Sequence, residues 1–186
     1  DIDSLRGYRE GVPKMLDLFK KHGIKASIFS SFGPDNSGKA IRRIFRKGFI
    51  SKMMRTKAPS TYGIKTLLYG TLLPAPMIVP SDPGILVRAV EEGHDCGVHA
   101  WDHVYVQDEL PGIGKSEFLS LFERSSEMFE RLSGKKPLSC AAPGWQISPV
   151  SLEVQEEAGL EYCSDTRGHS PFIPVFRGRT YSPVQI

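Results

Sequence analysis

Apolar residues recur at helical spacing in four segments of the chain, and a glycine follows each segment. The segments therefore predict helices over residues 8–22, 82–90, 116–133 and 148–158. Shorter apolar runs predict strands at 24–32, 96–98, 138–142 and 160–164, with one more within 175–186. Because strands alternate with helices, the pattern favours an α/β fold in which helices cover a parallel sheet, closed or open.

The composition is that of an ordinary soluble globular protein, with 40% hydrophobic and 24% charged residues in a chain of 186. This length suits one domain with a real core. No run of 18 uncharged apolar residues occurs, so no membrane-spanning helix is expected. Cys96, Cys140 and Cys163 lie in predicted strands without Cys-x-x-Cys spacing. They predict buried thiols in a reducing compartment rather than a disulfide framework or a cysteine metal site.

Charge is distributed unevenly along the chain. Residues 36–81 hold nine basic residues and no acidic one, while the rest holds 15 basic against 21 acidic residues. On a helical wheel, Arg42, Arg43, Arg46 and Lys47 fall on the side opposite the apolar residues. Such a stretch calls for an anionic partner, and its few aromatic residues argue against nucleic acid. We expect a segment that faces an anionic membrane, with a solvated insertion as the alternative.

Residues able to bind a metal ion gather at the predicted strand ends. Asp1 and Asp3 open the chain, and His99 and His103 follow the strand at 96–98. The carboxyl ends of parallel strands form the ligand sites of α/β folds. If the chain coils after that strand, both imidazoles face the same way, and two His with one carboxylate suit a catalytic metal. Capping of the first helix is the alternative explanation for one of the two aspartates.

These strand-end motifs resemble the polysaccharide deacetylase family. They read Asp-Ile-Asp at 1–3, His-Ala-Trp-Asp-His at 99–103, Ala-Ala-Pro-Gly-Trp at 141–145 and Ser-Asp-Thr-Arg-Gly at 164–168. Together with Gly-Pro-Asp-Asn at 33–36, they are most similar to one branch of the family. That branch removes the formyl group from 4-deoxy-4-formamido-L-arabinose linked to undecaprenyl phosphate. The resemblance implies a distorted (β/α) barrel and a metal-dependent hydrolase.

The resemblance also implies roles for particular residues. Asp3, His99 and His103 would hold a divalent ion, Zn(II) first and Mn(II) or Co(II) as alternatives, and Asp1 would act as the general base. A backbone N–H near Gly144 or Trp145 would bind the oxyanion.

The chain departs from the family pattern in three places. Ala141 stands where the family has an arginine that orients the base, so we expect Arg167 with Asp165, or Arg6, to replace it; a surface ion pair is the alternative. Ala100 stands where many relatives have Ser or Thr. The late histidine that serves as general acid would lie beyond Ile186. We therefore expect residues 1–186 to be one catalytic domain truncated at both ends, with residues 34–81 inserted as the membrane-facing segment.

The function implied is a deformylase at the cytoplasmic face of the bacterial inner membrane, in lipid A modification and polymyxin resistance. A deacetylase of peptidoglycan or another N-acetyl sugar polymer is a second possibility, and an inactive metal- or lipid-binding module is a third. An exported polymer enzyme would have no use for the basic insertion, which favours the first.

Overall fold

The structure is a computed structural model, and it describes residues 1–40 and 63–186. Arg42, Arg43, Arg46 and Lys47 lie outside the described residues, so their predicted arrangement on a helix stays a prediction.

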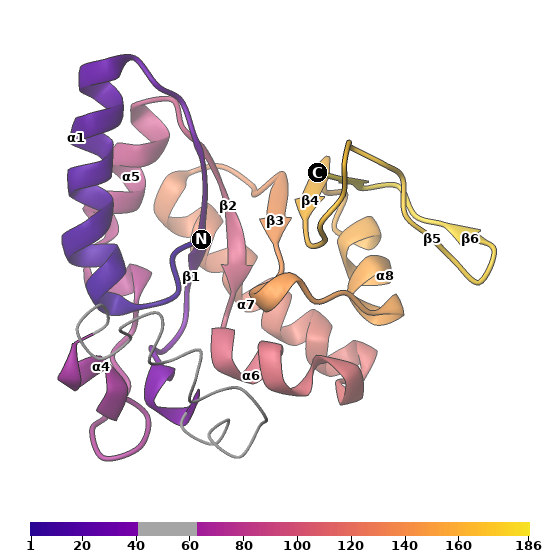
Figure 1. The fold of residues 1–186 in the computed structure, drawn as a ribbon, viewed down its shortest axis with the longest axis horizontal. Helices are drawn as coiled ribbons and strands as arrows, with labels where there is room; N and C mark the ends of the chain where they lie inside the picture. Colours follow the sequence, from indigo (N-terminus) through magenta and orange to yellow (C-terminus); the bar gives the residue numbers. More distant parts are fainter. Residues whose placement is uncertain (41–62) are drawn as a thin grey trace.

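The centre of the fold is a five-stranded parallel sheet in the order β1-β2-β3-β4-β7 (Figure 1). The strands are β1 (Ser27–Ser31), β2 (Asp95–Ala100), β3 (Ser139–Ala141), β4 (Tyr162–Ser164) and β7 (Val184–Gln185). Ile2 adds a parallel bridge to Ser30, so the start of the chain lies beside β1. The predicted α/β class and parallel sheet are confirmed, and the described strands form an open sheet.

Helices cover the sheet. The longer ones are α1 (Val12–His22), α5 (Pro83–Glu91), α7 (Lys115–Ser133) and α8 (Pro149–Glu157), and the shorter ones are α4 (Ile64–Leu68) and α6 (His103–Glu109). Single turns form η1 (Gly7–Gly11), η3 (Val79–Ser81), η4 (Leu110–Gly112) and η5 (Pro143–Trp145). Both α5 and α7 pack on β2, while α1 packs on α5 and α8 packs on α7. None of the helices in the described part of the chain has the length and apolar composition needed to cross a bilayer.

The local signals explain where these helices begin and end. Gly23 and Gly134 follow α1 and α7 in the left-handed conformation, which glycine adopts without a steric penalty. Ser148 caps α8 through a hydrogen bond from the backbone N–H of Ser151. Val12 and Leu16 lie on the inner face of α1, and both are buried in the core.

The last predicted strand is less regular than expected. Residues 175–186 divide into a hairpin of β5 (Val175–Phe176) and β6 (Arg179–Thr180), and only β7 joins the main sheet. The hairpin extends away from the sheet at the C-terminal side of the molecule (Figure 1).

Candidate metal centre

The three predicted ligands lie together at one edge of the sheet. Asp3 follows the bridge that Ile2 makes beside β1, His99 lies in β2, and His103 begins α6. The Nε2 atom of His103 is 3.7 Å from Oδ2 of Asp3, and the two imidazole centroids are 5.1 Å apart. The structure therefore brings Asp3, His99 and His103 into one group.

The two histidines do not share a helical turn. β2 ends at Ala100, and α6 begins at His103, where Oδ1 of Asp102 accepts a hydrogen bond from the N–H of Tyr105 at 3.1 Å. This N-cap starts the helix immediately after the strand. The pairing of the imidazoles thus comes from a strand-to-helix turn, with one histidine on each element.

His99 is fixed in the form that binds metals. Its side chain is buried, and its Nδ1 lies 2.7 Å from the carbonyl oxygen of Ala141. A carbonyl only accepts, so Nδ1 carries the proton in this hydrogen bond and Nε2 is left with a lone pair. Burial, with a further contribution from His103, lowers the pKa of His99 to about 3. The ring is therefore neutral at physiological pH and offers Nε2 as a ligand atom.

The chemistry of this group fits a catalytic divalent ion. Two imidazoles and one carboxylate suit Zn(II), Mn(II) or Co(II). The side chain of Asp3 is 36% exposed and that of His103 18% exposed, so water and substrate can reach the group.

Asp1 is exposed and lies two residues before Asp3. Its role as the base remains a prediction.

Asp35 and Asn36, which the sequence offered only as part of the motif at 33–36 and without a role, also organise the site. Asp35 is fully buried and accepts hydrogen bonds from the N–H of Leu5 at 2.8 Å and of Ser37 at 3.1 Å. Burial raises the pKa of Asp35, and the charge of Asp3 adds to that rise. Asn36 donates to Oδ2 of Asp102 at 2.5 Å, so this segment ties the loop after Asp3 to the start of α6. In the sequence, the only indication of this role is that two polar residues, Asp35 and Asn36, follow shortly after the predicted strand at 24–32.

Gly144 and Trp145 lie beside α6. Both have a positive φ, of 67° and 52°, and η5 packs against α6. A Cβ atom at Gly144 would lie 2.3 Å from the side-chain amide of Gln107, which explains the glycine. Trp145 is 52% exposed, and the guanidinium carbon of Arg167 lies 4.0 Å from its ring centroid. An exposed aromatic–arginine pair therefore stands next to the helix that carries His103.

The predicted pairing of Asp165 with Arg167 is not formed. Asp165 is fully buried and accepts hydrogen bonds from the side-chain amides of Gln155 at 2.7 Å and Gln185 at 3.4 Å. Burial raises the pKa of Asp165 to about 6. Arg167 is exposed on Trp145, because a charged guanidinium loses less hydration there than beside a buried acid. Arg6, the other candidate, pairs with Glu10 at 3.2 Å.

The three cysteines are buried and free, as the sequence predicts. No motif predicted, however, that Cys140 on β3 and Cys163 on β4 would lie side by side with Asp165 near them. Register between strands distant in the chain brings them together, and no local pattern encodes it.

A family profile described as polysaccharide deacetylase matches residues 6–163. The chain belongs to the polysaccharide deacetylase family. Among curated relatives of this chain, a Shewanella sediminis protein named as a 4-deoxy-4-formamido-L-arabinose-phosphoundecaprenol deformylase, ArnD, is 42% identical over 187 aligned residues, covering 100% of this chain. A protein of the same name from Wigglesworthia glossinidia brevipalpis is 28% identical and covers 97% of the chain. The chain spans only 61% and 63% of the lengths of these two relatives.

Solved structures agree with this deacetylase fold. A Mycobacterium smegmatis protein described as a polysaccharide deacetylase superposes with a TM-score of 0.61 at 16% identity, over 96% of this chain and 46% of its own. The allantoinase PuuE superposes with a TM-score of 0.59 at 17% identity, over 97% of this chain and 44% of its own. At such low identities the likeness concerns the fold alone.

Proposed function

We propose that this polysaccharide deacetylase is a metal-dependent hydrolase that removes the formyl group from 4-deoxy-4-formamido-L-arabinose carried on undecaprenyl phosphate. The observation that carries the proposal is the group formed by Asp3, His99 and His103 at the sheet edge. The 42% identity with the Shewanella sediminis protein supports the formamido sugar as substrate. Lipid A modification and polymyxin resistance are the corresponding biological setting.

The side chains divide the chemistry between them. Asp3, His99 and His103 would hold the divalent ion, with the Ala141 carbonyl keeping Nε2 of His99 available. When bound, such an ion supplies Lewis-acid polarisation of the formyl carbonyl and lowers the pKa of water toward neutrality. Asp1 would accept the proton of the attacking water. Water adds to the formyl carbon, the C–N bond breaks, and formate and a free amine result.

The oxyanion needs a donor close to the ligands. The N–H of Trp145 already donates to the carbonyl of Ala142 at 3.2 Å. Of the two N–H groups named from the sequence, we therefore assign the oxyanion contact to Gly144.

A small cavity of about 40 Å³ lies behind His99. Ala100, Trp101, Ala142 and Pro143 are among the residues that line it, and most of its surface is apolar. Of the three ligands only His99 lines it, so the cavity lies beside the group rather than within it.

Trp145 and Arg167 would recognise the rest of the substrate. The exposed indole offers a face for the sugar ring, and the guanidinium stacked on it offers donors for a phosphate. The basic segment that includes Arg42, Arg43, Arg46 and Lys47 would hold the enzyme peripherally on the anionic cytoplasmic face of the inner membrane. Flotation with anionic liposomes tests that placement, and a variant with these four residues neutralised that floats as well as the wild type would contradict it.

Formate release from a synthetic formamido-arabinose linked to undecaprenyl phosphate tests the activity. In the full-length protein, we expect the wild type to release formate and His103→Ala to lose about a thousandfold or more of the rate, since a catalytic ligand is removed. His169→Ala, which changes an exposed histidine outside the ligand group, is the matched control.

A second function is a deacetylase of an N-acetyl sugar polymer. A Helicobacter pylori peptidoglycan deacetylase that is 29% identical over 87 residues favours this alternative. Acetate release from an N-acetylglucosamine oligomer, measured beside formate release, separates the two. Equal formate rates for wild type and His103→Ala would overturn the metal-site proposal for either substrate.

A further inference from the structure

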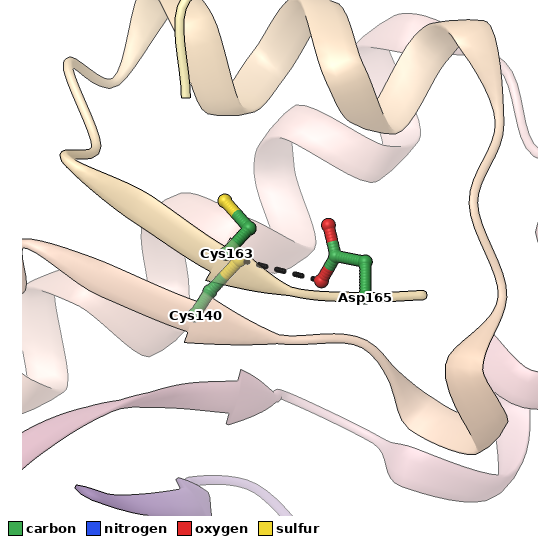
Figure 2. A group of neighbouring side chains, drawn as sticks. All are labelled: Cys140, Cys163 and Asp165. Carbon is green, nitrogen blue, oxygen red and sulfur yellow. Dashed lines mark hydrogen bonds between the residues drawn. The ribbon is translucent and has the colours of Figure 1, made fainter. Parts of the chain in front are cut away.

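Cys140, Cys163 and Asp165 form a second cluster of metal-binding side chains within the sheet. Cys140 on β3 and Cys163 on β4 are paired in register, and Asp165 follows β4 (Figure 2). Their two Sγ atoms and a carboxylate oxygen all lie within 4.8 Å of one another, and all three residues are buried. In the described ranges 1–40 and 63–186, no other three His, Cys, Asp or Glu side chains are grouped this closely.

The carboxylate of Asp165 lacks a cation. Its hydrogen-bond donors are all neutral: the side-chain amides of Gln155 and Gln185, the backbone N–H of Ala142 and, at 3.9 Å, the thiol of Cys140. No lysine or arginine of the described residues forms an ion pair with it. A buried carboxylate without a positive partner is costly, so the cluster is arranged to accept a proton or a cation.

The side chain of Gln155 donates hydrogen bonds to the cluster and has an oxygen, Oε1, that accepts none. Its Nε2 donates to Cys140 Sγ at 3.3 Å as well as to Asp165, and N–H donors to sulfur and carboxylate typically surround metal-bound ligands. Its Oε1 is buried without a hydrogen-bond partner, although the residue is only 3% exposed. A half-turn of the amide exchanges the two atoms: it gives up both Nε2 hydrogen bonds and places Oε1 beside the sulfur and the carboxylate, where a bound cation would take the place of the lost donor.

We propose that Cys140, Cys163 and Asp165 bind a thiophilic divalent cation of the Zn(II) class, with the Gln155 side-chain oxygen as the fourth ligand. The site is separate from the Asp3, His99 and His103 group. Two thiolates with oxygen ligands suit Zn(II) in a closed, tetrahedral structural site. Binding releases the two thiol protons to solvent and involves no change of oxidation state.

The position of the cluster gives the cation a structural role. Cys140 is the neighbour of Ala141, whose carbonyl fixes His99. A cation between β3 and β4 would hold this part of the sheet behind the catalytic ligand. Because the cluster is buried, the cation would enter while the chain folds.

Cobalt substitution tests the proposal. The protein is unfolded under reducing conditions, freed of metal and refolded with Co(II), which gives strong near-ultraviolet charge-transfer absorption when thiolates bind it and no such band with His and Asp ligands alone. We expect the band, with about two cobalt ions per chain. His103→Ala should keep the band and lose about one cobalt, whereas Cys140→Ser with Cys163→Ser should lose the band and keep the other ion. Cys96→Ser, which removes the buried thiol outside the cluster, is the matched control and should keep the band.

Two results would overturn the proposal. One is a folded wild type that binds cobalt without the band, which needs no variant and so is unaffected if a cysteine substitution prevents folding. The other is a pair of thiols missing from a thiol titration of the unreduced, denatured wild type, which would identify a Cys140–Cys163 disulfide instead. Neither result bears on formate release, so the proposed function is tested separately.

Discussion

Two groups of side chains adjoin strand β3, but their surroundings differ. One consists of Asp3, His99 and His103, and the other of Cys140, Cys163 and Asp165. The first lies at the ends of elements, with Asp3 and His103 partly exposed and only nitrogen and oxygen ligands. The second lies between β3 and β4, is buried, and includes two sulfur ligands. The Ala141 carbonyl connects them directly, because Ala141 follows Cys140 in the chain and its oxygen accepts the hydrogen bond that holds His99.

The difference separates two uses of a metal ion. An accessible group of three ligands leaves a position for water or substrate, as catalytic sites require. A buried cluster with a fourth ligand leaves no such position and would hold the strands together. Exposure of the ligands and their number therefore both tell the two apart in this sheet.

Chelation should separate the two sites most strongly. A chelator applied to the folded, cobalt-loaded protein should lower formate release about a hundredfold or more, because the accessible ion supplies the Lewis acid. Adding Zn(II), Mn(II) or Co(II) should restore the rate. The near-ultraviolet band should persist, since the buried ion exchanges only when the sheet opens. If activity and band disappear at the same rate, the contrast in accessibility is wrong.

Gly33→Ala should disturb the accessible group alone. A Cβ atom at Gly33 would lie 2.2 Å from the backbone carbonyl oxygen of Trp101, between His99 and His103. We expect a loss of about 1–3 kcal/mol in the free energy of unfolding, with reduced formate release and an unchanged cobalt band. Gly112→Ala, where a Cβ atom would meet nothing within 4 Å, is the control. Equal denaturant midpoints for the two variants would contradict the expectation.

Asp35→Asn should have the smallest effect, which is a change in how the free energy of unfolding depends on pH. Burial raises the pKa of Asp35, so the folded state holds its proton to a higher pH than the unfolded state does. This contribution to stability is full below the ordinary aspartate pKa of about 4 and is lost as the pH rises through the raised pKa. Asp35→Asn should therefore show a smaller fall in unfolding free energy between pH 4 and neutrality. Parallel curves for the two proteins, from denaturant unfolding at several pH values, would exclude this role.

The parts predicted from sequence are those encoded locally. Helix ends at Gly23 and Gly134 and the ligands Asp3, His99 and His103 could be named because each depends on a short motif. What escaped prediction depends on contacts between distant residues, such as the hydrogen bond of Asn36 to Asp102. The choice of Arg167 as partner for Asp165 failed for the same reason.

The register of the sheet is the clearest example. Nothing near Cys140 indicates that Cys163 will stand opposite it, because a shift of one residue would turn either side chain to the other face. The expectation of three unrelated buried thiols was correct about burial and could not anticipate their arrangement.

The Ala141 carbonyl has a consequence for how this family varies. Every amino acid supplies the same backbone oxygen, so the support for His99 survives any substitution at position 141 whose side chain the sheet can accommodate. The family's arginine can thus give way to Ala141 without removing this support, because the support comes from the peptide group. Comparisons of side chains will therefore overlook it, and only replacing the amide itself, for example by an ester bond through chemical synthesis, would show what it contributes.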